Sequence, residues 1–109
     1  MNIENSKAQL RKGVLEFCIL SVLSKGDGYA SEIIADLKDA KLIIVEGTLY
    51  PLLTRLKNEG LLTYRWEESK TGPPRKYYKL TDEGDEALLQ LREAWDELVE
   101  SINKLKVES

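Results

Sequence analysis

The sequence predicts a mainly α fold with a small β wing (α+β): a winged helix-turn-helix followed by a long C-terminal dimerisation helix. Residues 8–58 hold three stretches with helical periodicity. Two aromatic-rich, strand-like runs then flank a Gly-Pro-Pro turn, whose edges carry Lys70, Arg75 and Lys76. Because a helix followed by a basic-tipped hairpin is a layout that binds DNA, these observations bear on function as well as on fold.

Length and composition limit the class of protein. A chain of 109 residues with 42% hydrophobic side chains predicts a single domain with a modest core. No apolar run reaches about 18 residues, and residues 1–7 lack the apolar stretch of a signal peptide. We therefore expect neither a membrane span nor a secretory leader. A single cysteine cannot form an intramolecular disulfide, which fits a reducing cytoplasm.

The net charge of −3 hides a segregation of charge along the chain. Residues 1–47 carry six basic and seven acidic side chains, residues 48–79 carry seven and three, and residues 80–109 carry three and nine. Phosphate binding depends on the local field, because the Debye length is about 8 Å at physiological salt. A basic middle can therefore contact DNA while an acidic tail points away.

Two helices open the chain. Apolar residues at helical spacing predict a largely buried first helix over 8–24. Gly26-Asp27-Gly28 ends it and turns the chain. A second helix, about 29–39, directs four apolar side chains inward: Ala30, Ile33, Ile34 and Leu37.

A short strand and a third helix follow. Residues 42–45 are β-branched and apolar, so we interpret them as a brief strand that could add to the wing sheet. The third helix spans about 46–58, with Gly60 as its left-handed stop. Its buried stripe is Leu49, Leu52, Leu53 and Leu56. Pro51 clashes with the carbonyl four residues back, which places it in or near the first turn.

The C-terminal segment predicts a long helix that pairs with a second copy. Thr81 is its expected N-cap, and acidic side chains fill the first turn. Six apolar residues then recur at alternating steps of three and four, which is a heptad seam: Leu88, Leu91, Trp95, Leu98, Ile102 and Leu105. We predict two parts that form one compact unit, a DNA-binding region over 1–80 and a dimerisation helix over 81–109.

Enzymatic chemistry has no basis in this sequence. Without histidine there is no histidine-dependent triad, no histidine metal ligand and no imidazole pH switch. Cys18 lies on the apolar face of the first helix with no base nearby, so we interpret it as a small core side chain and not as a redox sensor. We predict no catalytic residue, no metal and no cofactor.

The outward face of the third helix is the first candidate site. Burial of its leucines directs the other side chains outward, and hydroxyls, a phenol and a guanidinium suit base edges and phosphates. Arg55 is the best candidate to bind both acceptors of a guanine, although it could equally pair with a phosphate. The alternative is an ordinary polar surface helix. The expected DNA-contacting residues of this helix are Thr48, Tyr50, Thr54, Arg55 and Asn58.

The hairpin is the second candidate site. Lys70, Arg75 and Lys76 surround the turn, where we expect contact with phosphates or the minor groove. The alternative is a solvated hairpin. Alternation along the strands places Tyr64 and Trp66 on one face and separates Tyr77 from Tyr78, and we interpret these four aromatic residues mainly as packing residues.

Three blocks of the sequence resemble the signature blocks of PadR-like transcriptional regulators. They are Gly28-Tyr29, GTLYPLLTRL at 47–56 and GPPRKYYKLTDEG at 72–84, in an order and spacing that cover residues 10–105. The short tail is similar to the small PadR subfamily, which has a single C-terminal dimerisation helix. The chain departs from the pattern at Val45, where relatives tend to place a polar cap.

The resemblance implies a homodimeric repressor that often controls a neighbouring transport, stress or detoxification operon. It places Tyr29 among the DNA-contacting residues. In multidrug-sensing relatives a tryptophan of the C-terminal helix lies at the dimer centre and stacks flat aromatic ligands, and Trp95 matches that position. The alternative, which we favour, is that Trp95 simply fills the dimer core.

The function predicted is a sequence-specific DNA-binding regulator that acts as a homodimer on double-stranded DNA with a pseudo-palindromic operator. A small-molecule inducer would act by changing the angle between the two C-terminal helices. Two alternatives stay open. One is a winged-helix module whose basic wing binds an acidic protein, and the other is a drug-binding protein without a regulatory role. The sequence discloses neither the operator, nor the inducer, nor the regulated gene.

Overall fold

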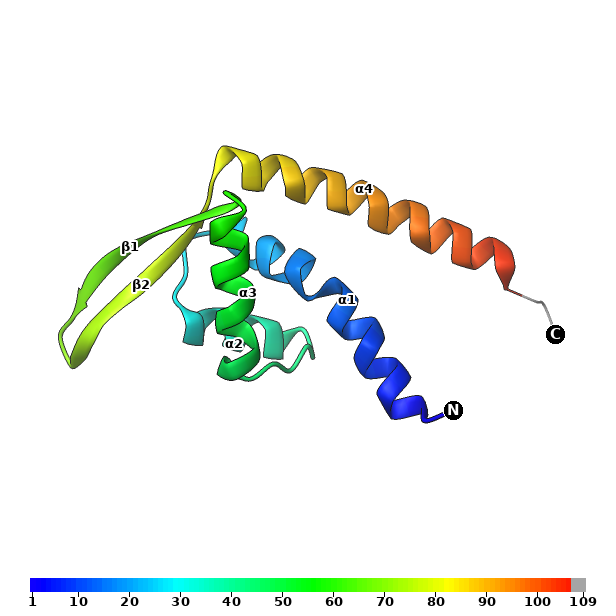
Figure 1. The fold of residues 1–109 in the computed structure, drawn as a ribbon, viewed down its shortest axis with the longest axis horizontal. Helices are drawn as coiled ribbons and strands as arrows, with labels where there is room; N and C mark the ends of the chain where they lie inside the picture. Colours follow the sequence, from blue (N-terminus) through cyan, green and yellow to red (C-terminus); the bar gives the residue numbers. More distant parts are fainter. Residues whose placement is uncertain (107–109) are drawn as a thin grey trace.

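The fold is a three-helix body from which a hairpin and a long helix project in opposite directions (Figure 1). The structure, a computed structural model, describes residues 1–106, so the last three residues of the predicted helix 81–109 lie outside the described part. Its elements are α1 (Ile3–Leu23), α2 (Ala30–Asp39), α3 (Glu46–Asn58), β1 (Leu62–Ser69), β2 (Gly72–Leu80) and α4 (Asp82–Leu105). The predicted mainly α fold with a small β wing is confirmed.

Helix α1 begins five residues earlier than predicted and is buried only in its C-terminal half. The Asn2 side chain caps it by accepting the backbone N–H of Asn5 at 3.2 Å. Ile19 and Leu20 are fully buried, whereas Leu10 is 75% exposed. The prediction of a largely buried helix was therefore wrong for the N-terminal half, because α1 extends beyond the other helices there (Figure 1).

Helix α2 packs on the C-terminal half of α1, and α3 packs on α2 and β1, which completes the core. Ile33 and Leu37 of α2 are buried, as are Leu49, Leu53 and Leu56 of α3. Full burial of each such side chain contributes about 1.5–3 kcal/mol. The bounds of α3 match the prediction, and Gly60 takes the left-handed conformation (φ 81°) expected of a helix stop. Pro51 lies in the second turn of α3, just beyond the predicted first turn.

Residues 42–45 form a connecting loop, so the predicted third strand was wrong. Ile44 points into the core while Ile43 and Val45 are exposed, an alternation that resembles a strand. The bridge to the sheet is made instead by Gly28, which pairs with Tyr78 of β2. The backbone N–H of Gly28 donates to the carbonyl of Tyr78, and the N–H of Tyr78 donates back to Gly28. Because it has no partner strand, this apolar segment only connects α2 to α3.

The hairpin turns at Lys70-Thr71 and not at the predicted Gly-Pro-Pro. Gly72, Pro73 and Pro74 belong to β2, where the register shifts between the pairs Glu67–Arg75 and Ser69–Gly72. Two β2 residues thus face one β1 residue, which is a bulge. A bulge tolerates proline because it leaves backbone groups outside the ladder. The two prolines therefore lie at the bulge of β2, next to the turn and not within it.

Helix α4 starts at the base of the hairpin and runs past α1, away from the wing (Figure 1). The Thr81 hydroxyl caps it by accepting the N–H of Gly84 at 3.0 Å, as predicted. A Cβ atom at Gly84 would lie 2.1 Å from the carbonyl oxygen of Leu61, so only glycine lets α4 approach the start of β1 so closely. No helix within residues 1–106 is long and apolar enough to cross a membrane.

Candidate nucleic-acid interface

The exposed surface of α3 divides into three stripes. At about 100° per residue, Gly47, Pro51, Thr54 and Asn58 lie opposite the buried leucines and form a central stripe. Tyr50 lies on one flank of this stripe, and Thr48 and Arg55 lie on the other. The five residues predicted to contact DNA are all exposed, but they are spread over the three stripes and do not form a single row.

The Tyr50 flank faces the wing across an open groove of about 520 Å³. The groove is lined on one side by Tyr50 and Thr54 of α3 and on the other by β2 from Gly72 to Lys76. Trp66 also lines it and is 60% exposed. The prediction that Trp66 is mainly a packing residue was therefore wrong. It presents a flat apolar surface to the groove.

The wing cations lie over aromatic rings. The Arg75 guanidinium lies 4.5 Å from the ring centre of Tyr29, and the Lys76 ammonium lies 4.6 Å from that of Tyr64. Lys76 also lies 5.3 Å from the Trp66 ring, its cross-strand partner. In the part of the chain that the structure describes, neither cation forms an ion pair. Cation–π contacts hold such groups without neutralising them, so their charge stays available to an anion.

Tyr29 occupies the start of α2 beside the wing. Its backbone N–H donates to the Glu32 carboxylate at 3.2 Å, and its ring meets the ring of Tyr77 edge-on at 5.1 Å. With Arg75 stacked on it, Tyr29 joins α2 to the wing and lines the same groove. The structure thus brings Tyr29, Tyr50, Thr54, Arg75 and Lys76 together, while Lys70 lies at the hairpin turn.

Arg55, predicted as the best candidate to bind guanine, forms ion pairs with two carboxylates of its own chain. Its Nε donates to Glu59 Oε1 at 3.1 Å, and its Nη1 lies 3.2 Å from Glu16 Oε1 on α1. The hydrogen bond to Glu59 and the charge of Glu16 both raise the pKa of Arg55. Two carboxylates therefore compete with DNA for this guanidinium, which makes it a weaker candidate for guanine than its position in sequence suggests.

The predicted alternation of the wing aromatics is confirmed. Tyr64 contacts both Trp66 (6.1 Å between ring centres) and Tyr78 (5.9 Å), whereas Tyr77 faces Tyr29 on the other side. Tyr78 is buried in the core. The two faces of the hairpin therefore have different roles, one against the core and groove and one against the start of α2.

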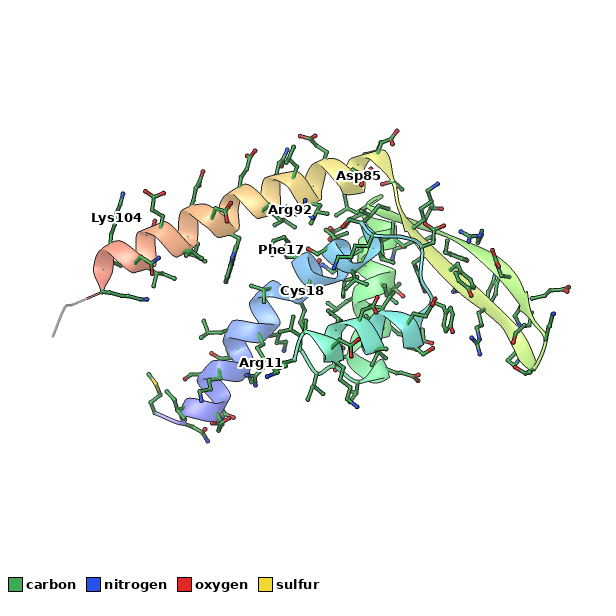
Figure 2. The ribbon with its side chains drawn as sticks, turned by 180° about the vertical axis from the view of Figure 1, so that it is seen from behind. Arg11, Phe17, Cys18, Asp85, Arg92 and Lys104 are labelled. Carbon is green, nitrogen blue, oxygen red and sulfur yellow. The ribbon has the colours of Figure 1, made fainter. Side chains whose placement is uncertain are left out.

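The C-terminal seam is largely uncovered in the single chain. Leu91 is 37% exposed, Trp95 is 43% exposed and Leu105 is 79% exposed. Leu88 differs, because it is 3% exposed and packs into the core of its own chain. The Trp95 ring lies 6.5 Å from that of Phe17, which projects from α1 toward α4 (Figure 2). The predicted seam thus begins inside the core and continues as an open apolar face.

Side chains that bind metals are not clustered in the described residues. Within 1–106, no cluster of three or more histidine, cysteine or carboxylate side chains could hold a metal ion. Partial burial raises the pKa of the Cys18 thiol, which disfavours the reactive thiolate. This environment fits the interpretation of Cys18 as a packing side chain.

Two participants in the site were missed from the sequence. Glu16 pairs with Arg55 from 39 positions away on another helix, and no local pattern marks such a pair. Trp66 could have been found by pairing the strands, since the register places it opposite Lys76. The shift of the turn by two residues obscured that register.

Comparisons with known proteins agree with this geometry. The family model described as "Transcriptional regulator PadR-like family" matches residues 19–90. A PadR-like transcription factor of Bacteroides fragilis is 59% identical, with a TM-score of 0.79, and the match covers 94% of this chain and 99% of that one. A PadR family regulator of Eggerthella lenta is 35% identical, with a TM-score of 0.88 over 94% and 90% of the two chains.

A third solved structure contains nucleic acid. It is the PadR protein of Bacillus subtilis in complex with operator DNA. It is 31% identical to this chain, with a TM-score of 0.67, and the match covers 72% of this chain and 46% of that one. With the family model, the wing and the exposed face of α3, these matches show that the chain belongs to the PadR-like family of transcriptional regulators and is a DNA-binding regulator.

Proposed function

We propose that the chain is a homodimeric repressor that inserts α3 into the major groove of a pseudo-palindromic operator. The observation that carries this proposal is the exposed central stripe of α3 beside the wing, where Lys70, Arg75 and Lys76 form no ion pair within residues 1–106. Gly47 and Pro51 are compact and allow close approach to base edges. Thr54 and Asn58 supply the donors and acceptors that distinguish base pairs.

The wing contacts the backbone that flanks the groove. Lys70, Arg75 and Lys76 carry uncompensated charge on a projecting hairpin, which suits phosphates or the minor groove. Tyr29 and Tyr50, on either side of the same groove, add hydroxyl groups that can donate to phosphates. Phosphate contacts fix the register of the protein, while α3 carries sequence information.

Dimerisation follows from the open face of α4. Leu91, Trp95, Leu98, Ile102 and Leu105 form an exposed apolar stripe at heptad spacing, and such a stripe stabilises a chain when a second copy covers it. Residues 1–80 then bind DNA and residues 81–109 pair the protomers. Two-fold symmetry places the half-sites about 10 bp apart. As a regulator of this kind, the protein would act in the cytoplasm.

Release by a small molecule would involve Trp95. Its ring is half-exposed next to Phe17, where α1 and α4 meet. A flat aromatic effector stacked between two such tryptophans would change the angle between the paired α4 helices. That angle sets the spacing of the two α3 helices, and therefore the affinity for the operator.

Selection of bound sequences from a random duplex pool at about 150 mM salt tests the proposal. We expect enrichment of a pseudo-palindrome, which would also supply the operator sequence. Binding without sequence enrichment would instead favour a winged-helix module that meets an acidic protein partner. Sedimentation of the complex gives the second readout, since the proposal requires two chains for each enriched duplex.

A further inference from the structure

We propose that Arg11 and Lys12 of α1 form a second cationic flank of the DNA interface, on the side of α3 opposite the wing. The inference rests on the proposed insertion of α3 into the major groove. A helix in that groove has phosphates on both sides. The wing supplies cations to one side only, so the other side needs a source of its own.

One side of α1 faces the flank of α3 that lies away from the wing. Thr48 and Arg55, seven residues apart, share that flank, because seven residues complete about two helical turns. Thr48 lines a groove with Arg11 and Lys12. Arg55 reaches Glu16, about one turn further along α1. Helix α1 thus comes near this flank of α3 at two positions, the shared groove and the ion pair.

The two ends of this flank differ in net charge. At the Arg55 end, Glu16 and Glu59 compensate the arginine, so little net positive charge remains. At the Thr48 end, Arg11 and Lys12 are exposed, and neither forms an ion pair within residues 1–106. Both cations therefore lie beside the N-terminal half of α3, where they can contact the phosphates next to the bases that this half meets.

The groove itself fits a backbone contact. It has a volume of about 400 Å³ and lies between α1, the loop before α3 and Thr48. Most of its lining is apolar, including Leu15 and Ile44, and its polar side chains are the two cations and the Thr48 hydroxyl. Long basic side chains commonly lay their apolar stems along such a surface and present the charge at its rim.

The test is the salt dependence of binding by the double variant Arg11→Ala Lys12→Ala. The probe is a fluorescently labelled duplex of about 30 bp that carries the sequence enriched by the wild-type protein. Each phosphate contact contributes about 0.9 to the slope of log affinity against log salt. We expect this slope to fall by roughly 1.8 per protomer, with a similar loss of affinity for every duplex sequence.

The matched control is Lys104→Ala Lys106→Ala, which removes the same charge from the far end of α4 (Figure 2). It should leave the slope close to the wild-type value. An unchanged slope for Arg11→Ala Lys12→Ala would overturn the inference, as would an equal loss in the control, which would indicate net charge alone. Failure of the wild-type protein to bind any duplex would instead refute the proposed function.

Discussion

At the scale of single residues, Gly84 shows how a small side chain can fix the position of a long helix. Its Cα approaches the backbone of Leu61 so closely that a methyl group would overlap the carbonyl. The Gly84→Ala variant should therefore lose about 1–3 kcal/mol of stability, because either α4 or the start of β1 must move. Chemical denaturation at a fixed protein concentration measures the loss.

Gly13 supplies the control for that substitution. It lies in the exposed half of α1, and a Cβ atom there would have no neighbour within 4 Å. Gly13→Ala should stabilise the protein by about 0.5–1 kcal/mol, since alanine favours a helix. If both variants had the same stability as the wild type, the close approach at Gly84 would not matter.

Charged residues of the interface differ in how strongly they are compensated. Arg55 pairs with two carboxylates, whereas Arg75 and Lys76 lie over aromatic rings. We expect Arg55→Ala to reduce the salt slope of DNA binding by clearly less than about 0.9, because its ion pairs already replace counterions. Arg75→Ala Lys76→Ala should reduce it by roughly 1.8. Binding measured over a series of salt concentrations checks this ranking. A larger loss of slope for Arg55→Ala than for Arg75→Ala Lys76→Ala would contradict it.

At the scale of elements, predictability followed the strength of local signals. The bounds of α3 could be predicted because leucines at helical spacing mark its buried face and a glycine marks its end. Residues 42–45 have the alternating pattern of a strand, but they pair with no strand, and the bridge to the sheet comes from Gly28. Pairing of strands depends on contacts that are remote in sequence, so composition alone could not reveal this.

The hairpin turn shows a similar competition. Gly-Pro-Pro is a strong turn signal, yet the chain turns two residues earlier and places the prolines at a bulge. Register is set by the side chains that face the core, here Leu62 opposite Leu80 and Tyr64 opposite Tyr78. The identity of the wing cations was predictable, but their stacking on Tyr29 and Tyr64 required the register.

At the scale of the whole molecule, the exposed face of α4 sets the expected assembly. Leu98 and Ile102 are each about half-exposed in the single chain, and a dimer would bury them. The Leu98→Asp Ile102→Asp variant should sediment as a monomer and lose most of its operator affinity, since only one half-site would remain in contact. Its helix content should stay near that of the wild type.

Glu97→Lys is a control on the exposed surface of the same helix, because it changes charge without entering the heptad seam. It should sediment as the wild type does. A monomeric wild-type protein, or a dimer that survives both aspartates, would show that the seam does not hold the protomers together. The symmetry argument for the operator would then lose its basis.

The central claim is that the central stripe of α3 determines which DNA sequence the protein binds. The most direct measurement compares the sequences selected from a random pool by the wild-type protein and by Thr54→Ala Asn58→Ala. Both side chains are exposed and make no contact that the core requires. We predict that the variant keeps its affinity for DNA in general but loses preference at defined positions in each half-site. An unchanged motif would contradict the account.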